Sequence, residues 1–358
     1  MKTSMNLYVH LPFCDHICFY CDFKRKVSIS KKEYIDALYK EFTSLNIDSI
    51  DTLYFGGGTP SSLSIDELKQ IGNWFIPYLS KDYEWTIECN PDSLTKDKII
   101  LFKEMGVNRI SLGVQSFQDE LLQKIGRHHS SFDVYRCIND LRECDLKNIS
   151  IDLIYALPNQ TLKQVQNDVN IFLSLQLPHC SIYSLQIEEN SVFGKQHLKP
   201  ADQDLEADMY DCICQTLKGY HHYEISSFCL NGYESKHNLV YWSDKDFTGI
   251  GWGSSGKEKG IRYDHASNYN DYLLDPLKRY FIETTKEDLM FEAIMMSLRT
   301  TFGLNVKQFN EKYKIDFYEC YKKTIQKYQN YFIQSKDSLV CTQEGRNILN
   351  TILIDFLE

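Results

Sequence analysis

The sequence predicts an α/β fold, an incomplete TIM-like (β/α)6 barrel followed by a smaller mixed, mainly helical C-terminal domain. From residue 7 to about 190, short apolar runs alternate with amphipathic stretches of helical length, which is typical of repeated βα units. Beyond about residue 195 this alternation stops, and no seventh or eighth unit is evident. With 358 residues, 43% of them hydrophobic, the chain is long enough for a barrel-sized domain and a smaller one.

Six strands and five intervening helices make up the predicted barrel. The strands are Leu7 to Leu11, Thr52 to Phe55, Trp85 to Cys89, Arg109 to Gln115, Ile149 to Tyr155 and Ser181 to Ile187. The helices are Lys31 to Leu45, Ile65 to Tyr78, Lys96 to Met105, Phe132 to Cys144 and Leu162 to Leu175. Ser64 and Thr161 stand at the N-cap positions of two of them, where a hydroxyl can accept from a free backbone N–H.

Three segments are predicted along the chain. Residues 1–195 form the partial barrel with its site, and 196–285 form a connecting segment that completes the barrel side. Within the latter, 201–219 has a helical pattern and 220–265 is rich in glycine, aromatic and polar residues. Residues 286–358 form a helical C-terminal domain with a winged-helix character.

Composition narrows the class of protein. The net charge is −10 and no run of five basic residues occurs, so we expect no nucleic-acid partner. The N-terminus has no signal-peptide apolar core, and no stretch approaches the ~20 apolar residues of a membrane-spanning helix. We therefore expect a cytoplasmic protein, in which the twelve cysteines serve as thiols and metal ligands and not as disulfides.

The unusual residues of the barrel all follow predicted strands. They are Cys14, Cys18 and Cys21 after the first strand, Gly56 to Pro60 after the second, Glu88 to Pro91 at the third, Gln115 to Phe117 at the fourth, Asp152 in the fifth and Tyr183 to Glu188 in the sixth. In barrels of this kind the active site is built at the carboxyl ends of the strands. Six separate segments are thus predicted to meet at one site.

Three cysteines in the order C-x3-C-x2-C can hold three corners of a metal cluster. Structural zinc sites and ferredoxin-type clusters normally use four protein ligands, so three leave one position open for a ligand. A zinc site completed by His10 or His16 is the alternative. The other nine cysteines show no such order, and Cys212 and Cys214 would point to different faces of a helix.

Three consecutive glycines precede Thr59 and Pro60 at the end of the second strand. Residues without Cβ allow the backbone to approach a ligand and to offer its amides and carbonyls. The segment is not a P-loop, because no Gly-Lys-Ser/Thr follows. A plain tight turn is the alternative.

Motifs along nearly the whole chain resemble the radical S-adenosylmethionine (SAM) superfamily, and within it the coproporphyrinogen-oxidase-like branch. They are His10-Leu-Pro-Phe-Cys14, Gly56-Gly-Gly-Thr-Pro60, Glu88-Cys-Asn-Pro91, Gly106 to Phe117, Gly126-Arg-His-His129, Asp152 to Pro158, Tyr183-Ser-Leu185, Tyr223 to Phe228 and His237-Asn-Leu-Val-Tyr-Trp242. Within the branch the chain is most similar to haem chaperones of the HemW type. The resemblance implies a 4Fe-4S cluster on Cys14, Cys18 and Cys21, with SAM on its open iron.

The resemblance also implies which residues line the SAM site. They are Tyr8, Gly57, Gly58, Thr59, Glu88, Gln115, Arg127 and Asp152. Arg127 suits the methionyl carboxylate, while Glu88 and Asp152 can accept from the ribose hydroxyls or the ammonium group. Taken singly, each of these three also fits an ordinary salt bridge or cap.

His237, with Tyr241 and Trp242 behind it, is the candidate haem contact. An imidazole can bind haem iron and the two aromatic rings could stack on a porphyrin, although a packed aromatic corner fits the residues equally well. His10, His128, His129, His221 and His222 compete for the same role. In Gly249 to Gly256 a serine replaces the histidine usual in the family, and no helix follows that would support a dinucleotide site.

The leading hypothesis is a radical-SAM-type haem chaperone that binds a 4Fe-4S cluster, SAM and haem and delivers haem to acceptor proteins. The alternative is an active radical SAM enzyme acting on a porphyrin, either a dehydrogenase similar to oxygen-independent coproporphyrinogen III oxidase or a methyltransferase. A zinc-stabilised barrel is the third. The oxidase carries a further cysteine where this chain has Phe23, and an N-terminal extension that is missing before Leu7. Both differences favour the chaperone.

Partners follow from the same resemblance. We expect haem, a haem-acceptor protein and an electron donor such as a flavodoxin or ferredoxin, and no nucleic acid. A peripheral membrane contact and a homodimer are left open, as are turnover and the catalytic residues.

Overall fold

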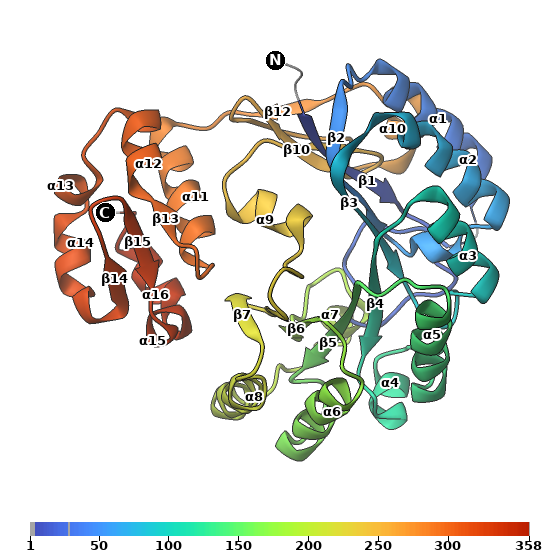
Figure 1. Ribbon diagram of the computed structural model, residues 1–358, viewed down its shortest axis with the longest axis horizontal. Helices are drawn as coiled ribbons and strands as arrows, with labels where there is room; N and C mark the ends of the chain where they lie inside the picture. Colours follow the sequence, from blue (N-terminus) through green and yellow to red (C-terminus); the bar gives the residue numbers. More distant parts are fainter. Residues whose placement is uncertain (1–3, 28, 358) are drawn as a thin grey trace.

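The computed structural model describes residues 4–27 and 29–357 and divides visibly into a large curved sheet covered by helices and a smaller C-terminal domain beside it (Figure 1). The sheet has nine strands in the order β7-β8-β6-β5-β4-β3-β2-β1-β9. The fold is thus the expected α/β partial barrel with an additional domain.

Six parallel strands form the body of the sheet and confirm the six that the sequence predicts. They are β1 (Ser4–Leu11), β2 (Ser49–Gly57), β3 (Leu79–Cys89), β4 (Arg109–Gln115), β5 (Ile149–Tyr155) and β6 (His179–Ser184). Each pairs in parallel with the next along the chain. Their carboxyl ends therefore share one edge, which is the condition for a common site.

Three further strands, which the sequence did not predict, extend this sheet at both sides. β9 (Thr248–Ile250) pairs in parallel with β1, and β8 (Ser227–Cys229) pairs antiparallel with β6. β7 (His221–Glu224) then pairs antiparallel with β8. Strands of three or four residues are too short to show a periodic pattern, so they were hidden in the glycine- and aromatic-rich segment 220–265.

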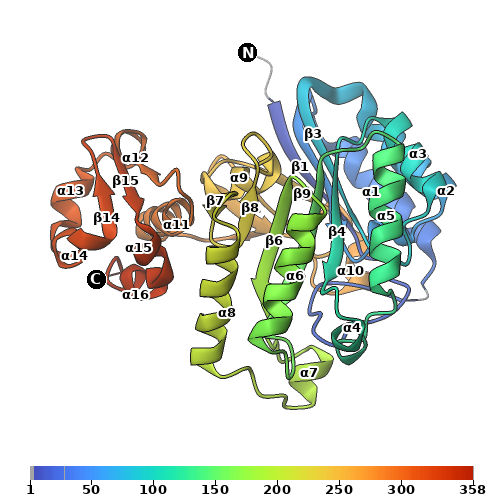
Figure 2. The ribbon, with the colours of Figure 1, turned by 60° about the horizontal axis from the view of Figure 1, so that its bottom comes forward.

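Helices cover the convex side of the sheet (Figure 1). They are α1 (Lys31–Ser44), α2 (Ile65–Phe75), α3 (Lys96–Met105), α4 (Asp119–Lys124), α5 (Ser131–Glu143), α6 (Leu162–Ser174), the short α7 (Val192–Lys195) and α8 (Gln203–Thr216). Ser64 and Thr161 both form capping boxes, as their positions predicted. α8 lies beside α6 in both ribbon views (Figure 2).

A second, three-stranded sheet follows the barrel strands. β10 (Ser255–Glu258), β11 (Ile261–Asp264) and β12 (Tyr280–Ile282) pair antiparallel in that order. α9 (Lys236–Trp242) precedes this sheet along the chain, and α10 (Tyr269–Leu274) lies in the connection from β11 to β12. The C-terminal domain follows β12.

The C-terminal domain has its own hydrophobic core, built from residues between Met290 and Phe356. Its helices are α11 (Lys286–Leu298), α12 (Val306–Tyr313), α13 (Phe317–Cys320), α14 (Lys322–Lys327), α15 (Gln343–Asn347) and α16 (Leu349–Ile354). A small antiparallel sheet of β13 (Leu304–Asn305), β15 (Ser338–Cys341) and β14 (Phe332–Gln334) completes it. The domain is mixed and mainly helical, while the boundaries at 195 and 285 stay predictions.

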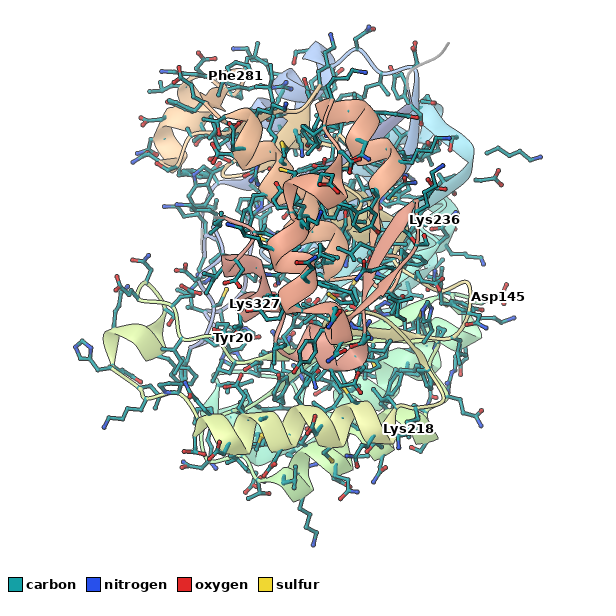
Figure 3. All side chains as sticks on the ribbon, turned by 90° about the vertical axis from the view of Figure 1, so that its left-hand side faces the viewer. Tyr20, Asp145, Lys218, Lys236, Phe281 and Lys327 are labelled. Atoms are coloured by element: carbon teal, nitrogen blue, oxygen red, sulfur yellow. The ribbon has the colours of Figure 1, made fainter. Side chains whose placement is uncertain are left out.

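Polar contacts join the two domains. The backbone N–H of Thr301 donates to the carbonyl of Tyr223 over 2.9 Å. Lys257 forms an ion pair with Asp244, which also accepts from Lys312 of the C-terminal domain at 2.7 Å. Figure 3 looks onto this domain, with Lys327 on its surface and α8 running below it. No helix in the described ranges is long and apolar enough to cross a membrane.

Candidate functional site

A cavity of about 530 Å³ lies at the carboxyl ends of the parallel strands. Among the predicted site residues, those that line it are Cys14, Cys18, Cys21, Gly57, Gly58, Thr59, Glu88, Gln115, Arg127 and Asp152. They come from five successive strands or the loops after them. The structure thus brings together segments more than one hundred residues apart, as the shared edge of a parallel sheet requires. Tyr8 and His237 do not line it.

The cysteine loop leaves β1 and is pinned at three points by backbone hydrogen bonds. The N–H of Lys26 donates to the carbonyl of Pro12 at 2.6 Å, and the N–H of Cys14 donates to the carbonyl of Lys26 at 3.0 Å. Farther along, the N–H of Phe19 donates to the carbonyl of Ile125 at 2.9 Å. The loop therefore closes on its own base and is tied to the segment that carries Arg127.

The three thiols differ in their surroundings. The sulfur of Cys14 lies 3.7 Å from the hydroxyl of Thr59, and burial raises its pKa to about 11. Burial also raises the pKa of Cys21. Burial acts in the same direction on Cys18, but a hydrogen bond from His16 and the charge of Arg127, whose Nη1 is 3.5 Å from the sulfur, outweigh it and lower the pKa. Cys18 is the thiol best prepared to act as a thiolate ligand.

The spacing of the sulfurs can be compared with what one zinc ion needs. Tetrahedral ligands at about 2.3 Å from zinc lie roughly 3.8 Å apart. Within residues 4–27 and 29–357, the cysteine loop is not a group whose ligand atoms all lie within 4.8 Å of one another. His10 has both ring nitrogens engaged, with the hydroxyl of Tyr8 at 3.1 Å and the carbonyl of Lys24 at 2.7 Å. The donor set fits a wider cluster better than zinc.

The glycine segment packs directly against the cysteine loop. Gly57 has a φ of +113°, and a Cβ there would lie 2.6 Å from the ring of His10. A Cβ on Gly58 would lie 2.6 Å from the carbonyl oxygen of Phe13. The N–H of Thr59 donates to that same carbonyl at 2.6 Å. Only glycine fits at 57 and 58, because any side chain would push the two loops apart.

Two carboxyl groups lie inside the cavity. Glu88 accepts hydrogen bonds from the hydroxyl of Tyr54 at 2.8 Å and from the N–H of Gly57 at 3.2 Å. Asp152 accepts from the hydroxyl of Ser111 at 2.9 Å. Burial raises the pKa of Glu88 to about 7, with the negative charge of Asp152 adding to the effect, and burial raises the pKa of Asp152 as well. Neither carboxylate forms an ion pair with a described residue, so a cationic ligand would stabilise both.

Arg127 supplies positive charge on the opposite wall. Its Nη2 donates to Asn90 at 2.7 Å and to the carbonyl of Gly113 at 2.5 Å, while its buried Nε has no hydrogen-bond partner within the described part of the chain. A Cβ on Gly113 would lie 3.0 Å from the side-chain amides of Asn90 and Gln115. Gln115 itself has a φ of +67°. The β4 end thus keeps open space beside a guanidinium, which suits a carboxylate.

Sequence reasoning missed several lining residues, above all Arg109, Ser111 and Tyr54. Ser111 and Arg109 lie two and four positions before Gly113 on β4, and alternate residues of a strand face the same side. Counting back in steps of two from Gln115 would have found them. Asn90 lies within the quoted motif at the end of β3 but was not singled out.

Tyr8 lies behind the cavity wall. Its hydroxyl is 3.1 Å from Nδ1 of His10, and its ring lies 6.0 Å from that of Tyr54. Tyr54 in turn holds Glu88. Tyr8 therefore lies next to a residue of the wall, and its contact with SAM stays a prediction.

His237, the candidate haem contact, is buried in the structure and is not accessible to a ligand. Its Nδ1 is 2.8 Å from the hydroxyl of Thr52 and its Nε2 is 2.8 Å from that of Tyr241. The side chain is fully buried, its ring lies 5.1 Å from that of Tyr54, and burial lowers its pKa to about 3. With both ring nitrogens taken, His237 belongs to the packed aromatic corner that was the alternative interpretation.

The competing histidines differ in access. Those with a ring nitrogen on a backbone carbonyl are His10, His129 and His222, and His221 pairs with Glu234. His128 is exposed, and its ring stacks on that of His16 with centroids 3.8 Å apart. His16 lines the cavity, so this pair marks its rim.

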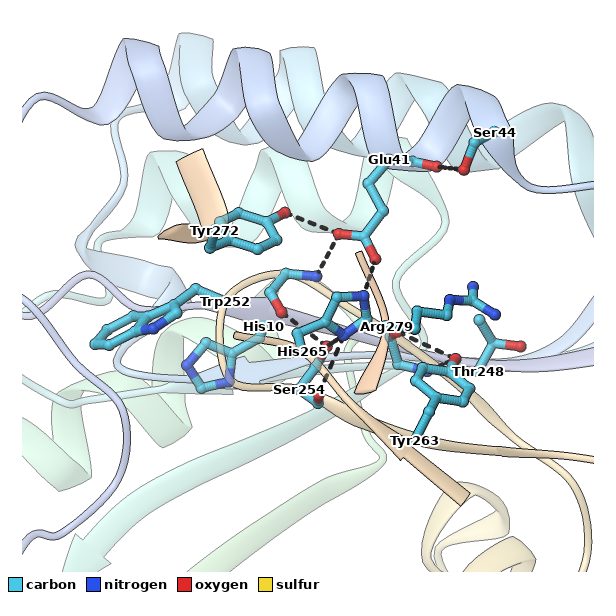
Figure 4. Close-up of polar contacts among 12 residues, drawn as sticks. His10, Glu41, Ser44, Thr248, Trp252, Ser254, Tyr263, His265, Tyr272 and Arg279 are labelled. Carbon is cyan, nitrogen blue, oxygen red and sulfur yellow. Dashed lines mark hydrogen bonds and ion pairs between the residues drawn. The ribbon is translucent and has the colours of Figure 1, made fainter. Parts of the chain in front are cut away.

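A buried polar network surrounds Glu41 of α1 (Figure 4). Glu41 of α1 accepts from the N–H of Gly251 at 2.9 Å and from the hydroxyl of Tyr272 at 2.8 Å, and its other oxygen lies 2.6 Å from Nε2 of His265. Nδ1 of His265 lies 2.9 Å from the hydroxyl of Ser254. Two hydrogen bonds thus satisfy Oε2 of this buried carboxylate, and His265 is its ion-pair partner at Oε1.

The glycine-rich segment 249–256 connects this network to the cysteine loop. The N–H of Trp252 donates to the hydroxyl of Tyr34, which donates to the carbonyl of His10 at the end of β1. The ammonium groups of Lys24 and Lys26 lie over the Trp252 ring at 5.9 and 5.7 Å. The segment is a structural support, and exposed Ser255, which replaces the family histidine, donates to the carboxylate of Asp264.

Comparison with known proteins agrees with this geometry. Residues 8–171 match the radical SAM superfamily and residues 284–348 match the HemN C-terminal domain. The haem chaperone HemW of Lactococcus lactis is 39% identical over 100% of this chain and 98% of its own. The chain belongs to the haem chaperone HemW family.

Two more comparisons bear on the family and the fold. The haem chaperone HemW of Bacillus subtilis is 40% identical over 87% of both chains. Coproporphyrinogen III oxidase (HemN) from Escherichia coli is a solved structure with a TM-score of 0.86, covering 99% of this chain and 90% of its own. At 20% identity that likeness concerns the fold alone. This chain therefore shares the fold of that protein over nearly its whole length.

Proposed function

We propose that this chain is a haem chaperone that holds a 4Fe-4S cluster and SAM at the cavity, binds haem as cargo and delivers it to an acceptor protein. The observation that carries the proposal is the match, over its whole length, to relatives named haem chaperone HemW. The cavity supports it, because its charged groups suit both ends of a zwitterionic ligand.

Cys14, Cys18 and Cys21 would hold the cluster, leaving one iron open towards the cavity. The ammonium of SAM would lie at Glu88, beside the glycine segment, and its carboxylate would lie near Arg127. Asp152, on the neighbouring strand, would accept from the ribose hydroxyls. A cluster with SAM on its open iron supplies one-electron chemistry when both are bound. The residues themselves bind, orient and neutralise the charges of this ligand.

Haem would bind at the rim of the same cavity. Phe23 and Tyr183 both line the cavity and are 71% and 44% exposed, so they offer aromatic faces to a flat apolar ligand. His128, exposed and stacked on His16, is the imidazole placed to reach a haem iron there. Phe23 stands where the oxidase has a cysteine, which gives this position a direct role in cargo binding.

The second candidate is an active radical SAM enzyme acting on a porphyrin, either an oxidase-like dehydrogenase or a methyltransferase. It is favoured by the length of the cavity, which continues past Asp152 to Tyr183 of β6 and to Gln186 and Glu188 after this strand. That part could hold a substrate beside SAM. Anaerobic incubation of reduced protein with SAM and coproporphyrinogen III distinguishes it, because only the oxidase yields protoporphyrinogen.

Other partners follow from the proposal. A flavodoxin or ferredoxin would reduce the cluster, and a haem protein would accept the cargo, in the cytoplasm. The peripheral membrane contact and the homodimer stay predictions that gel filtration and vesicle sedimentation can address.

Haem titration tests the proposal. Adding haem to the purified chain should shift the Soret band and saturate near one haem per chain, and His128→Ala should alter the band while the matched surface variant His197→Ala leaves it unchanged. Absence of saturable binding would contradict the chaperone function. Saturable binding with an unchanged spectrum in His128→Ala would contradict the proposed ligand only.

A further inference from the structure

A second group of metal-type ligands lies at the other end of the barrel. His221 comes from β7, Cys229 from β8, and Glu234 from the loop that leads to α9. One ligand atom from each, a ring nitrogen, a sulfur and a carboxylate oxygen, lie within 4.8 Å of one another. Within the described ranges no other three histidine, cysteine or acidic residues meet this condition.

The pairing of the strands separates this group from the cavity. Cys229 pairs with His179, the first residue of β6, whereas Ser184, the last residue of β6, lines the cavity. The cysteine loop, the glycine segment and Glu88 line the cavity from the carboxyl ends of the strands, whereas the group lies towards the amino ends. Arg109, the first residue of β4, lines the cavity and is 3.4 Å from His179. A ligand bound there would not be in contact with the cysteine loop.

Each ring nitrogen of His221 has a partner. Nδ1 of His221 is 3.1 Å from Oε1 of Glu234, and its Nε2 is 3.1 Å from the hydroxyl of Thr301. Cys229 is fully buried at the base, while the side chains of His221 and Glu234 are 33% and 20% exposed. Water and ions can therefore reach the group from one side only.

Placing a thiol beside a carboxylate is unfavourable once the thiol ionises, unless a cation lies between them. Nitrogen, thiolate and carboxylate are all ligands of zinc, and three protein ligands with a water are a common zinc arrangement. Ligand atoms of a tetrahedral zinc lie roughly 3.5 to 4 Å apart, so side-chain shifts of less than about 1 Å would close the site. Thr301 would orient the imidazole through its second nitrogen, as metal-bound histidines require.

We propose that His221, Cys229 and Glu234 form a binding site for a divalent cation of the zinc type, with a water as the fourth ligand. Binding releases the thiol proton of Cys229 to solvent. Because Thr301 belongs to the connection after α11, and its N–H also binds the carbonyl of Tyr223, the metal would fix how the C-terminal domain is attached to the sheet edge. The site is structural or regulatory and takes no part in the cavity.

The test uses the full chain with Cys14, Cys18 and Cys21 all replaced by serine, so that the cysteine loop cannot bind the added metal. Cobalt(II) serves as a coloured substitute for zinc. About one equivalent should produce thiolate-to-cobalt charge-transfer absorption and tetrahedral visible bands, and zinc should displace it. Adding Cys229→Ser should abolish the charge transfer, whereas the matched change of exposed Cys320→Ser should leave it intact.

Two results of the cobalt titration would overturn the site directly, and a third applies if Cys229→Ser does not fold. One is the absence of charge-transfer absorption in the parent variant, and the other is its persistence after Cys229→Ser. If circular dichroism shows that Cys229→Ser does not fold, Glu234→Gln in the same parent decides, since loss of one ligand should weaken cobalt binding at least about tenfold. Cobalt affinity that is unchanged in a folded Glu234→Gln variant would also overturn it.

Discussion

The contribution of the Glu88 carboxylate to SAM binding can be measured. It is the carboxyl that the glycine segment and Tyr54 hold inside the wall, with its pKa raised by burial to about 7 and with no cation paired to it. If the ammonium of SAM binds there, SAM binds the ionised form. Glu88→Gln keeps the size and the hydrogen-bonding capacity of the side chain but removes this charge.

The magnitude follows from the contact and from the pKa. A hydrogen bond to a charged group contributes about 1.5–3 kcal/mol, so Glu88→Gln should weaken SAM binding about 10- to 150-fold at pH 8. The wild-type affinity should be level above the free pKa of about 7 and fall as pH drops, because the proton must first leave. The loss should be about twofold at pH 7 and about tenfold at pH 6.

The assay is anaerobic isothermal calorimetry of SAM with cluster-loaded protein across this pH range. Protonation of SAM itself affects both proteins equally, so the difference between wild type and Glu88→Gln isolates the carboxyl. Glu189→Gln, an exposed carboxyl outside the cavity, is the matched control and should behave as wild type. A Glu88→Gln variant with the wild-type affinity and pH profile would refute the reasoning.

Three further predictions follow from the same structure. Cys18→Ser should remove most of the iron that anaerobic reconstitution incorporates, whereas exposed Cys320→Ser should keep it; equal iron in both would exclude the cluster site. Gly57→Ala should lower thermal stability and cluster content together, because its Cβ would strike His10 at a φ of +113°; an unchanged melting temperature would contradict the close packing of the two loops. Glu41→Ala removes the partner of His265, Tyr272 and Gly251, so it should lower the free energy of unfolding in urea by about 3–5 kcal/mol. Asp36→Ala, at an exposed position of the same helix, should lower it by less than about 0.5 kcal/mol. Similar losses for both variants would contradict the network.

The sequence was sufficient for the parallel body of the sheet. Short β-prone segments between helical patterns mark these strands, as in Arg109 to Gln115, where Ile110, Leu112 and Val114 alternate with other residues and all seven residues of β4 are buried. β7, β8 and β9 could not be found in this way, since their three or four residues carry no period. Their existence depends on tertiary pairing with β6 and β1.

The sequence predicted which segments meet at the site, because the topology of the sheet decides this. It did not predict the orientation of individual side chains. Parallel strands bring their carboxyl ends together, so the positions of Cys14, Glu88 and Asp152 at one cavity followed from the order of the motifs. The direction of a side chain depends on tertiary packing, which the motifs do not show. His237 is the second residue of α9, and its ring is buried with Thr52 and Tyr241 on its two nitrogens.

The group of His221, Cys229 and Glu234 was also not predictable from the sequence. His221 was considered only as a competing haem ligand, and Cys229 as one of nine incidental thiols. Seven residues lie between them along the chain, a spacing with no metal-site signature. The antiparallel register of β7 on β8 pairs these two residues directly, and only the folded chain shows it.

Delivery of haem is the central claim, and the kinetics of transfer test it most directly. Haem-loaded protein is mixed with increasing amounts of an apo haem protein from the same cell, with apomyoglobin as a passive trap for released haem. A chaperone should transfer to its acceptor at a rate that rises with acceptor concentration and exceeds the rate of capture by apomyoglobin. A single rate, independent of acceptor and equal to passive release, would contradict the proposed function.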